Sequence, residues 1–555
     1  MTTNAMKNFK TRFLLGSLFA ILLPASVFPD MYPKNADIDA INYIFKIALS
    51  DTTDEISGEA TVDVRFLAAG ISELRLDLIN ASDALAGKGM TVSRVILGGK
   101  PVRFTHRNDA LIISLPVPSS VRQRSSFTVF YKGIPATGLK IANNRYGDRT
   151  FFSDNWPDKG RNWLPTIDHP SDKAMCEFIV TAPSHYQVVS NGLKIEETDL
   201  PDNQRLTHWK QSVPIASWLY VLGAARFAVQ YVDEFEGKSI QTWVYRQDRD
   251  AGFYDFGYIT KDALGFYSDS IGPFSYEKLA NIQSNSVSGG MEAASAILYS
   301  ESSVSGDRSI RWRNVVIHEI AHQWFGNAVT EKDWDEVWLS EGFATYFTLL
   351  FIEHQYGRDA FLEGLRSSKV SVDNFYRKNP DYRIIHDDLK DMKDVTTSQI
   401  YQKGSWTLHM LRGVIGTENF WKVFRSYYRK YRDSNATVDD FRREMEEASG
   451  KDLSGFFEQW LFKPGTLKLK GDWSFDKERK QLKVNLDQVQ NDGSLFSMPI
   501  EIGIYYPGEN KPQIERILVD KQSNTVSLNL KEIPEKVVLD PNTWVLMDAE
   551  FAEKR

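Results

Sequence analysis

Two histidines and two glutamates stand at a spacing that can build a catalytic metal site. The chain reads HEIAH at 318–322, and Glu341 follows after eighteen intervening residues, within WLSEGFATYF. Residues four apart share one face of an α-helix, so His318 and His322 can each direct one ring nitrogen at the same ion. Glu341 can return from a second helix as the third ligand, which leaves one position open for water. The spacing therefore predicts one catalytic Zn²⁺ per chain.

Glu319 lies one position round the helix from His318, so its carboxylate points beside the ion rather than at it. A general base that accepts a proton from an activated water is needed at that place. Chance is a poor explanation of the pattern, because only 9 of the 555 residues are histidine. Glu319 is therefore the predicted catalytic base.

Two helices must position these side chains. The first carries apolar residues on its buried face and is expected to stop at Gly326, and the second spans roughly 336–356 and ends at Gly357. The apolar positions of the first helix are Ile310, Trp312, Val315, Val316, Ala321 and Phe325.

The pattern of the whole chain predicts an α+β protein of several domains. Residues 30–235 are rich in alternating apolar runs such as ISGEATVDVRF, which predicts a large, mostly antiparallel β domain. Residues 236–465 read as mostly helical, with a capping box at Thr437 and Asp440. Short alternating strands resume over 466–555 and predict a small β-sandwich.

The N-terminus is typical of an export signal, predicted over 1–29. Lys7, Lys10 and Arg12 precede the apolar run 13–23, which is too short to span a bilayer comfortably. We expect an exported protein, periplasmic or secreted, without stable membrane insertion after removal of the signal. An uncleaved signal would leave a membrane tether.

Composition and charge exclude some partners. The net charge of −7 gives no basic footprint for nucleic acid. Cys176, the only cysteine, cannot form an intrachain disulfide and lies in an apolar run, so we expect it to be a buried packing residue.

Two further segments complete a family pattern. VSGGMEAASAILY (287–299) precedes the histidines, and IYQKGSW (400–406) follows them. Together with HEIAH and WLSEGFA, they resemble the aminopeptidase N and leukotriene hydrolase family of zinc metallopeptidases, the gluzincins. The segments 164–174, 456–466 and 537–548 also resemble that family's domain signatures. The resemblance implies a thermolysin-like catalytic domain over 236–465, in a short form without the helical domain that follows in many relatives. A more open cleft is then expected.

The resemblance also implies roles for single residues. His318, His322 and Glu341 would hold zinc, and Glu319 would pass a proton from water to the leaving amine. Tyr401 would donate its hydroxyl to the oxyanion of the tetrahedral intermediate. The remaining implied residues contact the substrate: Glu292 pairs with its free α-ammonium, Gly289 and Gly290 leave room for its backbone, and Met291 belongs to the same segment. The implied substrates are peptides with a free N-terminus.

The chain departs from the family at the amine site. The Asn that usually follows the Met-Glu pair is Ala293, and Trp156 stands where a Gln or Glu helps to bind the amine. Asp154 is a weak substitute. Two alternatives therefore stay open beside an exported aminopeptidase: epoxide hydrolysis in the same site, or a non-catalytic peptide-binding relative.

Overall fold

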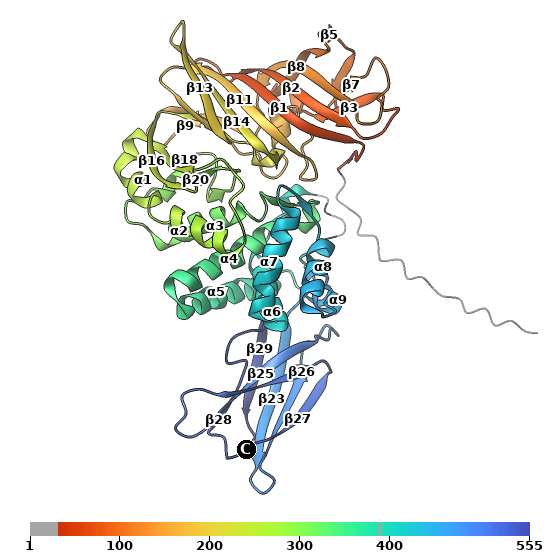
Figure 1. Cartoon of the computed structure of the whole chain (residues 1–555), viewed down its shortest axis with the longest axis vertical. Coiled ribbons are helices and arrows are strands. Elements are labelled where there is room, and N and C mark those ends of the chain that lie inside the picture. The colour runs from red at the N-terminus through yellow and green to blue at the C-terminus, as the bar shows by residue number, and fades with distance from the viewer. Residues whose placement is uncertain (1–31, 387–388, 390, 555) are drawn as a thin grey trace, which may run out of the picture.

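The computed structural model describes residues 32–386, 389 and 391–554. The predicted signal, residues 1–29, lies outside this range. Figure 1 shows three units stacked along the long axis: a β domain, a helical middle and a second β domain. Among the described residues, none of the helices combines the length and apolar character that crossing a membrane would need.

The N-terminal domain is built on one large sheet and two smaller ones. The large sheet runs in the order β13 (Leu193–Leu200), β14 (Gln204–Ala216), β11 (Lys173–Pro183), β1 (Ile38–Ala48), β2 (Ile56–Phe66), β8 (Arg124–Ile134), β4 (Gly89–Leu97) and β5 (Lys100–Pro101). The smaller sheets run β12 (Gln187–Ser190), β15 (Leu222–Ala225), β10 (Arg149–Ser153), β9 (Leu139–Asn143), and β3 (Glu73–Asp77), β7 (Ala110–Ser114), β6 (Phe104–Arg107).

Alternation along β2 explains how this domain is held together. Ala60, Val62, Val64 and Phe66 are fully buried, as their period of two predicts, while the residues between them are partly exposed. Pairing in the large sheet is antiparallel except between β1 and β11, which run parallel. Cys176 on β11 is buried and unpaired.

A five-stranded sheet opens the middle unit. Its order is β16 (Phe227–Phe235), β17 (Lys238–Tyr245), β18 (Lys278–Ser284), β20 (Ala296–Ser300) and β19 (Gly290–Met291), and a short pair, β21 (Val329–Glu331) and β22 (Ser434–Ala436), lies apart from it. β16 comes before residue 236, where the sequence pattern placed the start of this unit. Strand pairing nevertheless joins β16 to the middle unit's sheet.

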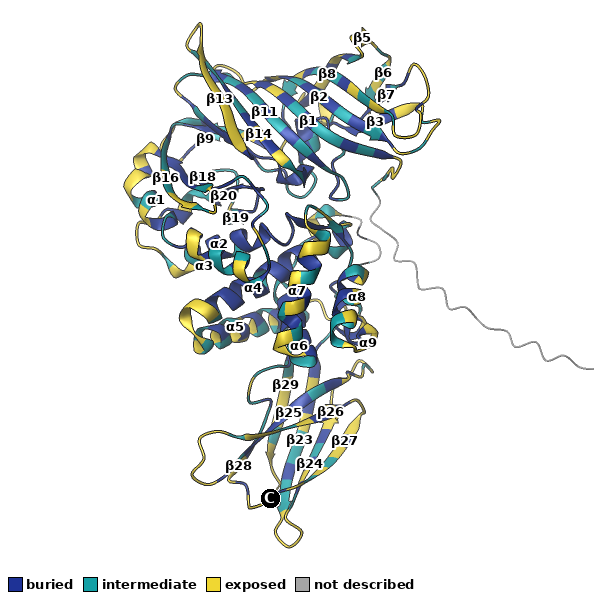
Figure 2. Ribbon diagram, in the orientation of Figure 1, coloured by how far each residue is buried: buried dark blue, intermediate teal, exposed yellow. Residues whose placement is uncertain are grey.

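Helices make up the rest of the middle unit. They are α1 (Arg249–Phe256), α2 (Thr260–Ser270), α3 (Ile310–His322), α4 (Trp338–Tyr356), α5 (Arg358–Tyr376), α6 (Gly404–Ile415), α7 (Thr417–Tyr431), α8 (Val438–Ser449) and α9 (Ser454–Phe457). The central one is α4, with 14 of its 19 residues buried; it packs against α3, α5 and α6 (Figure 2). The capping box of Thr437 and Asp440 starts α8 as predicted.

One detail of the first predicted helix was wrong. Ile310 begins α3 but is 67% exposed, although Trp312 in the same turn is buried, so Ile310 does not share the buried face of the helix. The helix ends at His322, so Phe325 and Gly326 lie in the loop that follows it.

The C-terminal unit consists of two sheets. One runs β27 (Ser523–Asn529), β24 (Gln481–Gln488), β23 (Leu467–Asp476) and β29 (Met547–Glu553), and the other β26 (Gln513–Val519), β25 (Met498–Tyr505) and β28 (Lys536–Leu539). Buried Leu482, Val484 and Leu486 alternate along β24. The succession of β, helical and β units confirms the predicted α+β architecture.

Candidate active site

The three predicted zinc ligands meet between α3 and α4. Nε2 of His318 lies 3.0 Å from Nε2 of His322. Oε2 of Glu341 lies 3.4 Å from the first of these nitrogens and 3.2 Å from the second. One turn of α3 presents both rings on one face, and the first turn of α4 brings the carboxylate to them.

These separations fit a metal ion. Tetrahedral zinc with ligands at about 2.0–2.1 Å places neighbouring ligand atoms about 3.3 Å apart. Oε2 of Glu341 is also buried and has no hydrogen-bond donor among the described residues, which a coordinated ion would explain. Two imidazoles and one carboxylate are a donor set that zinc accepts.

Contacts behind His322 fix which of its nitrogens faces the site. Nδ1 lies 3.1 Å from the carbonyl oxygen of Phe325 and 3.1 Å from the hydroxyl of Ser340. A carbonyl can only accept, so Nδ1 carries the proton and Nε2 presents its lone pair to the ligand cluster. Only glycine fits at position 326. Its φ is +103°, and a Cβ there would lie 2.1 Å from Oγ of Ser340.

Glu319 is buried next to the ligands, as predicted. Burial, reinforced by the negative charge of Glu292, raises the pKa of Glu319 well above its usual range. A raised pKa suits a carboxylate that must accept a proton from water.

Gly290 is confined by Glu319, a contact that the sequence did not predict. A Cβ at Gly290 would lie 2.2 Å from Oε1 of Glu319, so the missing side chain makes room for the base. Nothing lies within 4 Å of a Cβ placed on Gly289, so that glycine faces open space. Met291 is buried on β19.

Tyr401 reaches the cluster from the other side. It lies in a π-helical turn, Gln399–Lys403, directly before α6. Its hydroxyl donates a hydrogen bond of 2.8 Å to Oε1 of Glu341. Burial and the charge of Glu341 raise the pKa of Tyr401 well above its usual value, so the phenol keeps its proton. Burial by itself would raise the pKa of the Glu341 carboxyl. The neighbouring imidazoles outweigh that effect and lower this pKa, and His322 contributes more than His318.

Two glycines let these elements approach closely. A Cβ on Gly342 would lie 3.1 Å from Cα of Gly404 and 3.1 Å from the carbonyl oxygen of Ile400. Gly342 follows Glu341 directly, and Gly404 comes three residues after Tyr401. This crossing of α4 and α6 therefore sets the distance between the ligand and the phenol.

Glu292 lies beside the base. Carboxylate oxygens of Glu292 and Glu319 and a ring nitrogen of His322 lie within 4.8 Å of one another. Oε1 of Glu292 is buried and lacks a hydrogen-bond partner among the described residues. Burial raises the pKa of Glu292 to about 7. The positive charge of His322 opposes this rise, and the negative charge of Glu341 adds to it. An unpartnered carboxyl here can accept an ammonium group.

The departures from the family pattern have clear structural positions. Trp156 packs edge-on against Trp218 and Trp334, with ring centroids 4.8 and 4.9 Å apart. Its ring is therefore part of an aromatic cluster and brings no carboxylate or amide oxygen that could accept from an amine. Asp154 accepts a hydrogen bond of 2.7 Å from Lys159, so its charge is already paired. Ala293 is buried.

Sequence reasoning missed the residues that hold Glu292. The side-chain amides of Gln323 and Asn327 donate to the backbone carbonyl oxygen of Glu292 at 3.1 and 2.6 Å. Both residues stand in QWFGN, directly after HEIAH. Their nearness to the motif was the available signal, because polar residues just past a buried helix need partners.

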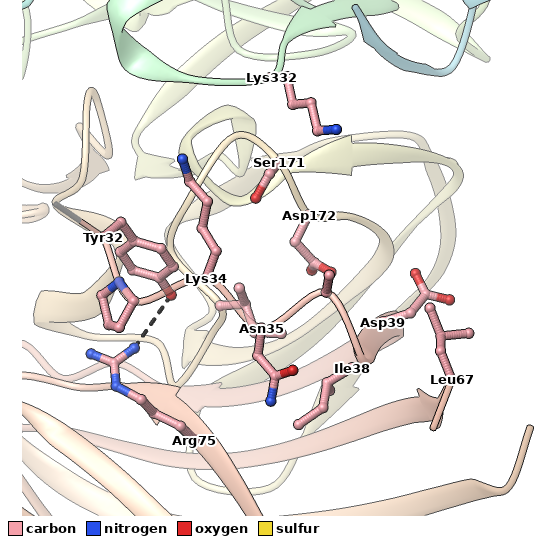
Figure 3. Close-up of a pocket in the computed structure, with 13 residues that line it drawn as sticks. Tyr32, Lys34, Asn35, Ile38, Asp39, Leu67, Arg75, Ser171, Asp172 and Lys332 are labelled. Atoms are coloured by element: carbon pink, nitrogen blue, oxygen red, sulfur yellow. Dashed lines mark hydrogen bonds between the residues drawn. The ribbon is translucent and has the colours of Figure 1, made fainter. Parts of the chain in front are cut away.

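A separate cavity of about 560 Å³ lies between the N-terminal domain and Lys332 (Figure 3). Of the described residues that line it, none belongs to the predicted site. Its charged side chains are largely paired: Arg75 with Asp77, Asp39 with Arg65, and Lys34 with Asp333. This cavity is therefore separate from the cluster of His318, His322 and Glu341.

Comparison with known proteins places this site in a family. Residues 39–219 match the model of the peptidase M1 N-terminal domain, and residues 258–460 match the model of the peptidase family M1 domain. The chain belongs to peptidase family M1, which confirms the resemblance drawn from its motifs.

Individual relatives are distant and longer. A probable aminopeptidase 1 of Sulfurisphaera tokodaii is 26% identical over 85% of this chain and 60% of its own length. Human glutamyl aminopeptidase is 28% identical over 63% of this chain and 38% of its own length. The chain thus spans about two fifths to three fifths of these two relatives.

A crystal structure of an M1 zinc metallopeptidase from Deinococcus radiodurans shares the fold. Its TM-score is 0.66 at 22% sequence identity, and the match covers 76% of this chain and 93% of that one.

Proposed function

We propose that this protein is a zinc-dependent aminopeptidase that holds one Zn²⁺ and hydrolyses N-terminal residues from peptides. The observation that carries the proposal is the cluster of three donor atoms, 3.0–3.4 Å apart, with a buried base on one side and a protonated phenol on the other. Membership of peptidase family M1 supports it.

The residues divide the reaction among themselves. Zinc held by His318, His322 and Glu341 would polarise the scissile carbonyl and lower the pKa of water to about 7. Glu319 accepts a proton from the attacking water and gives it to the leaving amine. The Tyr401 hydroxyl, which donates to Glu341 in the structure, would turn its single proton to the oxyanion that forms on the substrate, a contribution of roughly 3–4 kcal/mol.

Glu292 gives the proposed enzyme its preference for chain ends. Its unpartnered oxygen lies in the same cluster as the base, so an α-ammonium bound there keeps the first peptide bond next to Glu319. A peptide with a blocked N-terminus would bring no cation to offset the buried carboxylate. The lack of polar groups at Trp156 leaves Glu292 with most of this task.

We also propose that the protein is exported. The basic residues at 7–12 and the apolar run 13–23 support export, and comparing the masses of precursor and mature protein in cell fractions would test it.

Purified full-length protein provides the test of the activity. We expect about one zinc per chain, hydrolysis of an aminoacyl reporter, and loss of turnover after chelation. Glu319→Gln should keep its zinc and lose about 10²–10⁴-fold in kcat, because the base is removed while the ligands stay. Undiminished turnover by Glu319→Gln would reject the mechanism.

The same preparation tests the alternatives. Epoxide opening without aminoacyl hydrolysis would favour an epoxide hydrolase over an aminopeptidase. A chain that contains no zinc and turns over neither substrate would favour a peptide-binding protein. The complete set of ligands, base and phenol supports catalysis over both.

A further inference from the structure

The segment that carries Glu292 ends in a strained turn. The amide of Ala296 donates to the carbonyl oxygen of Ala293 at 3.1 Å and closes a tight turn. Ser295, inside this turn, has a φ of +63°. Residues with a Cβ rarely adopt this left-handed conformation, so contacts from outside the turn must hold Ser295 in it.

A buried lysine supplies much of that hold. Nζ of Lys278, at the start of β18, donates to the carbonyl oxygen of Ser295 at 3.2 Å and to its hydroxyl at 3.4 Å. The same ammonium donates to the carbonyl oxygen of Ser190 at 2.9 Å and lies 4.9 Å from the ring centroid of Trp209. Lys278 is completely buried. It thus ties the turn to the N-terminal domain.

Other contacts from the N-terminal domain reach the same turn. The amide of Gly192 donates to the hydroxyl of Ser295 at 2.8 Å, and that hydroxyl lies 3.3 Å from Oε1 of Gln211. The side chain of Asn191 donates to the carbonyl oxygen of Ala294 at 2.7 Å. The turn is therefore fixed on the side away from the ligand cluster.

Gln323, directly after the end of α3, fixes the other side. Oε1 of Gln323 accepts from the amide of Ser295 at 3.0 Å, and Nε2 of Gln323 donates to the carbonyl oxygen of Glu292 at 3.1 Å. Glu292 lies three residues before Ser295 and shares Gln323 with it as a hydrogen-bond partner, so a change in the turn is passed to Glu292 through the backbone and through Gln323.

We propose that Lys278 and Ser295 are positioning residues for the amine site: by holding the turn after Glu292, they set the affinity for the α-ammonium of the substrate. This inference rests on the proposed aminopeptidase function and deepens it. Neither residue touches the reacting atoms. Their effect should therefore fall on substrate binding and leave the chemical step, which Glu319 and Tyr401 carry out, largely unchanged.

Kinetics of Lys278→Met and Ser295→Ala on a leucyl reporter test the proposal. We expect KM to rise about tenfold or more in each variant, with kcat within about threefold of wild type and zinc content unchanged. Ser295→Gly should raise KM less than Ser295→Ala. Glycine adopts a positive φ without strain, and its carbonyl oxygen still accepts from Lys278.

A matched control separates positioning from loss of stability. His409→Gln removes a fully buried side chain that bonds Tyr346 and Thr543, outside the amine site. It should lower the melting temperature and leave KM unchanged. Should Lys278→Met fail to fold, Ser295→Ala and Ser295→Gly decide the matter.

Two results would overturn the inference. One is a KM equal to wild type in the folded variants, and the other is an equal rise in KM for His409→Gln at an equal loss of melting temperature. Either would leave the proposed function intact, because the wild type would still turn over the reporter. Absence of turnover in zinc-loaded wild type would instead reject the proposed function, and this inference with it.

Discussion

At Gly290 the lack of a side chain determines where the carboxylate of Glu319 can lie. Family resemblance implied that both Gly289 and Gly290 leave room for substrate. The structure separates them, since only Gly290 would push a Cβ onto Glu319. Of these two adjacent glycines, only Gly290 is confined by a protein side chain.

Gly290→Ala should reduce kcat by about 10²-fold or more, because the methyl group displaces the base. Zinc content should stay at the wild-type level, since the ligands lie elsewhere. Gly289→Ala is the matched control for displacement of Glu319. Its Cβ meets no protein atom, so any effect should fall on KM and kcat should remain near wild type. Equal losses of kcat in the two variants would contradict this assignment.

Tyr401→Phe should lower kcat by about 10²–10³-fold, the usual effect of removing one donor to an oxyanion. The phenol keeps its proton because burial and Glu341 raise its pKa, so it acts as a donor across the physiological pH range. Single-turnover measurements at saturating reporter check the prediction. A variant with unchanged kcat but a raised KM would assign Tyr401 to substrate binding instead.

At the scale of elements, the crossing of α4 and α6 matters most. Backbones meet at Gly342 and Gly404, and this contact brings the Tyr401 hydroxyl within 2.8 Å of Oε1 of Glu341, sixty residues away in the sequence. A side chain at either glycine would separate the two elements while leaving each intact.

Gly404→Ala should lower kcat by about tenfold, because its Cβ would lie 3.1 Å from Cα of Gly342 and would shift the turn that carries Tyr401. In a Tyr401→Phe background the same change should cost little, since the group it displaces is already gone. A double-mutant cycle measures this coupling. Additive effects would show that Gly404 acts through something other than Tyr401.

Sequence periodicity predicted much of the secondary structure. The alternation of β2, the end of α4 at Gly357 and the capping box of α8 are local patterns, and the structure confirms them. The π-helical turn at Tyr401 was not predictable, because it stands at the start of α6 and, among the described residues, no helical turn directly precedes it whose apolar period it could shift.

Contacts between distant segments escaped the sequence for a different reason. Spacing within HEIAH fixes two ligands on one helix, but no spacing shows that Gly290 faces Glu319. Nor could it show that Ile310 would project into solvent, because burial depends on where the neighbouring helices end. The ligands followed from local geometry, whereas the packing around them required the fold.

Across the whole molecule, His409 connects the helical unit to the C-terminal β domain. From α6 it bonds the hydroxyl of Tyr346 at 3.0 Å and the carbonyl oxygen of Thr543 at 2.9 Å, and its ring stacks on Trp544. Burial lowers the pKa of His409 to about 3, although the Thr543 carbonyl opposes the shift.

The folded pKa of His409 lies below its unfolded value of about 6.5, so the stability it contributes is present above that pH and is lost as the pH falls towards 3. From about pH 8 to about pH 5, the free energy of unfolding should fall about 2 kcal/mol more in wild type than in His409→Gln. Urea titrations of chelated protein at both pH values measure the difference. Identical pH dependence in both proteins would show that His409 does not titrate with unfolding.

Because α4 is buried, binding of the metal ion should also raise the thermal stability of the protein. Glu341 lies on a helix with 14 of 19 residues buried, so the carboxylate cannot swing away without opening the centre of the molecule. An ion that binds only the folded arrangement stabilises it by RT ln(1 + [L]/Kd), about 4 kcal/mol at a thousandfold excess over Kd. Calorimetry should therefore show the helical unit melting at a lower temperature after chelation, and readdition of zinc should restore it. In this protein, losing the metal would weaken the scaffold as well as stop the reaction.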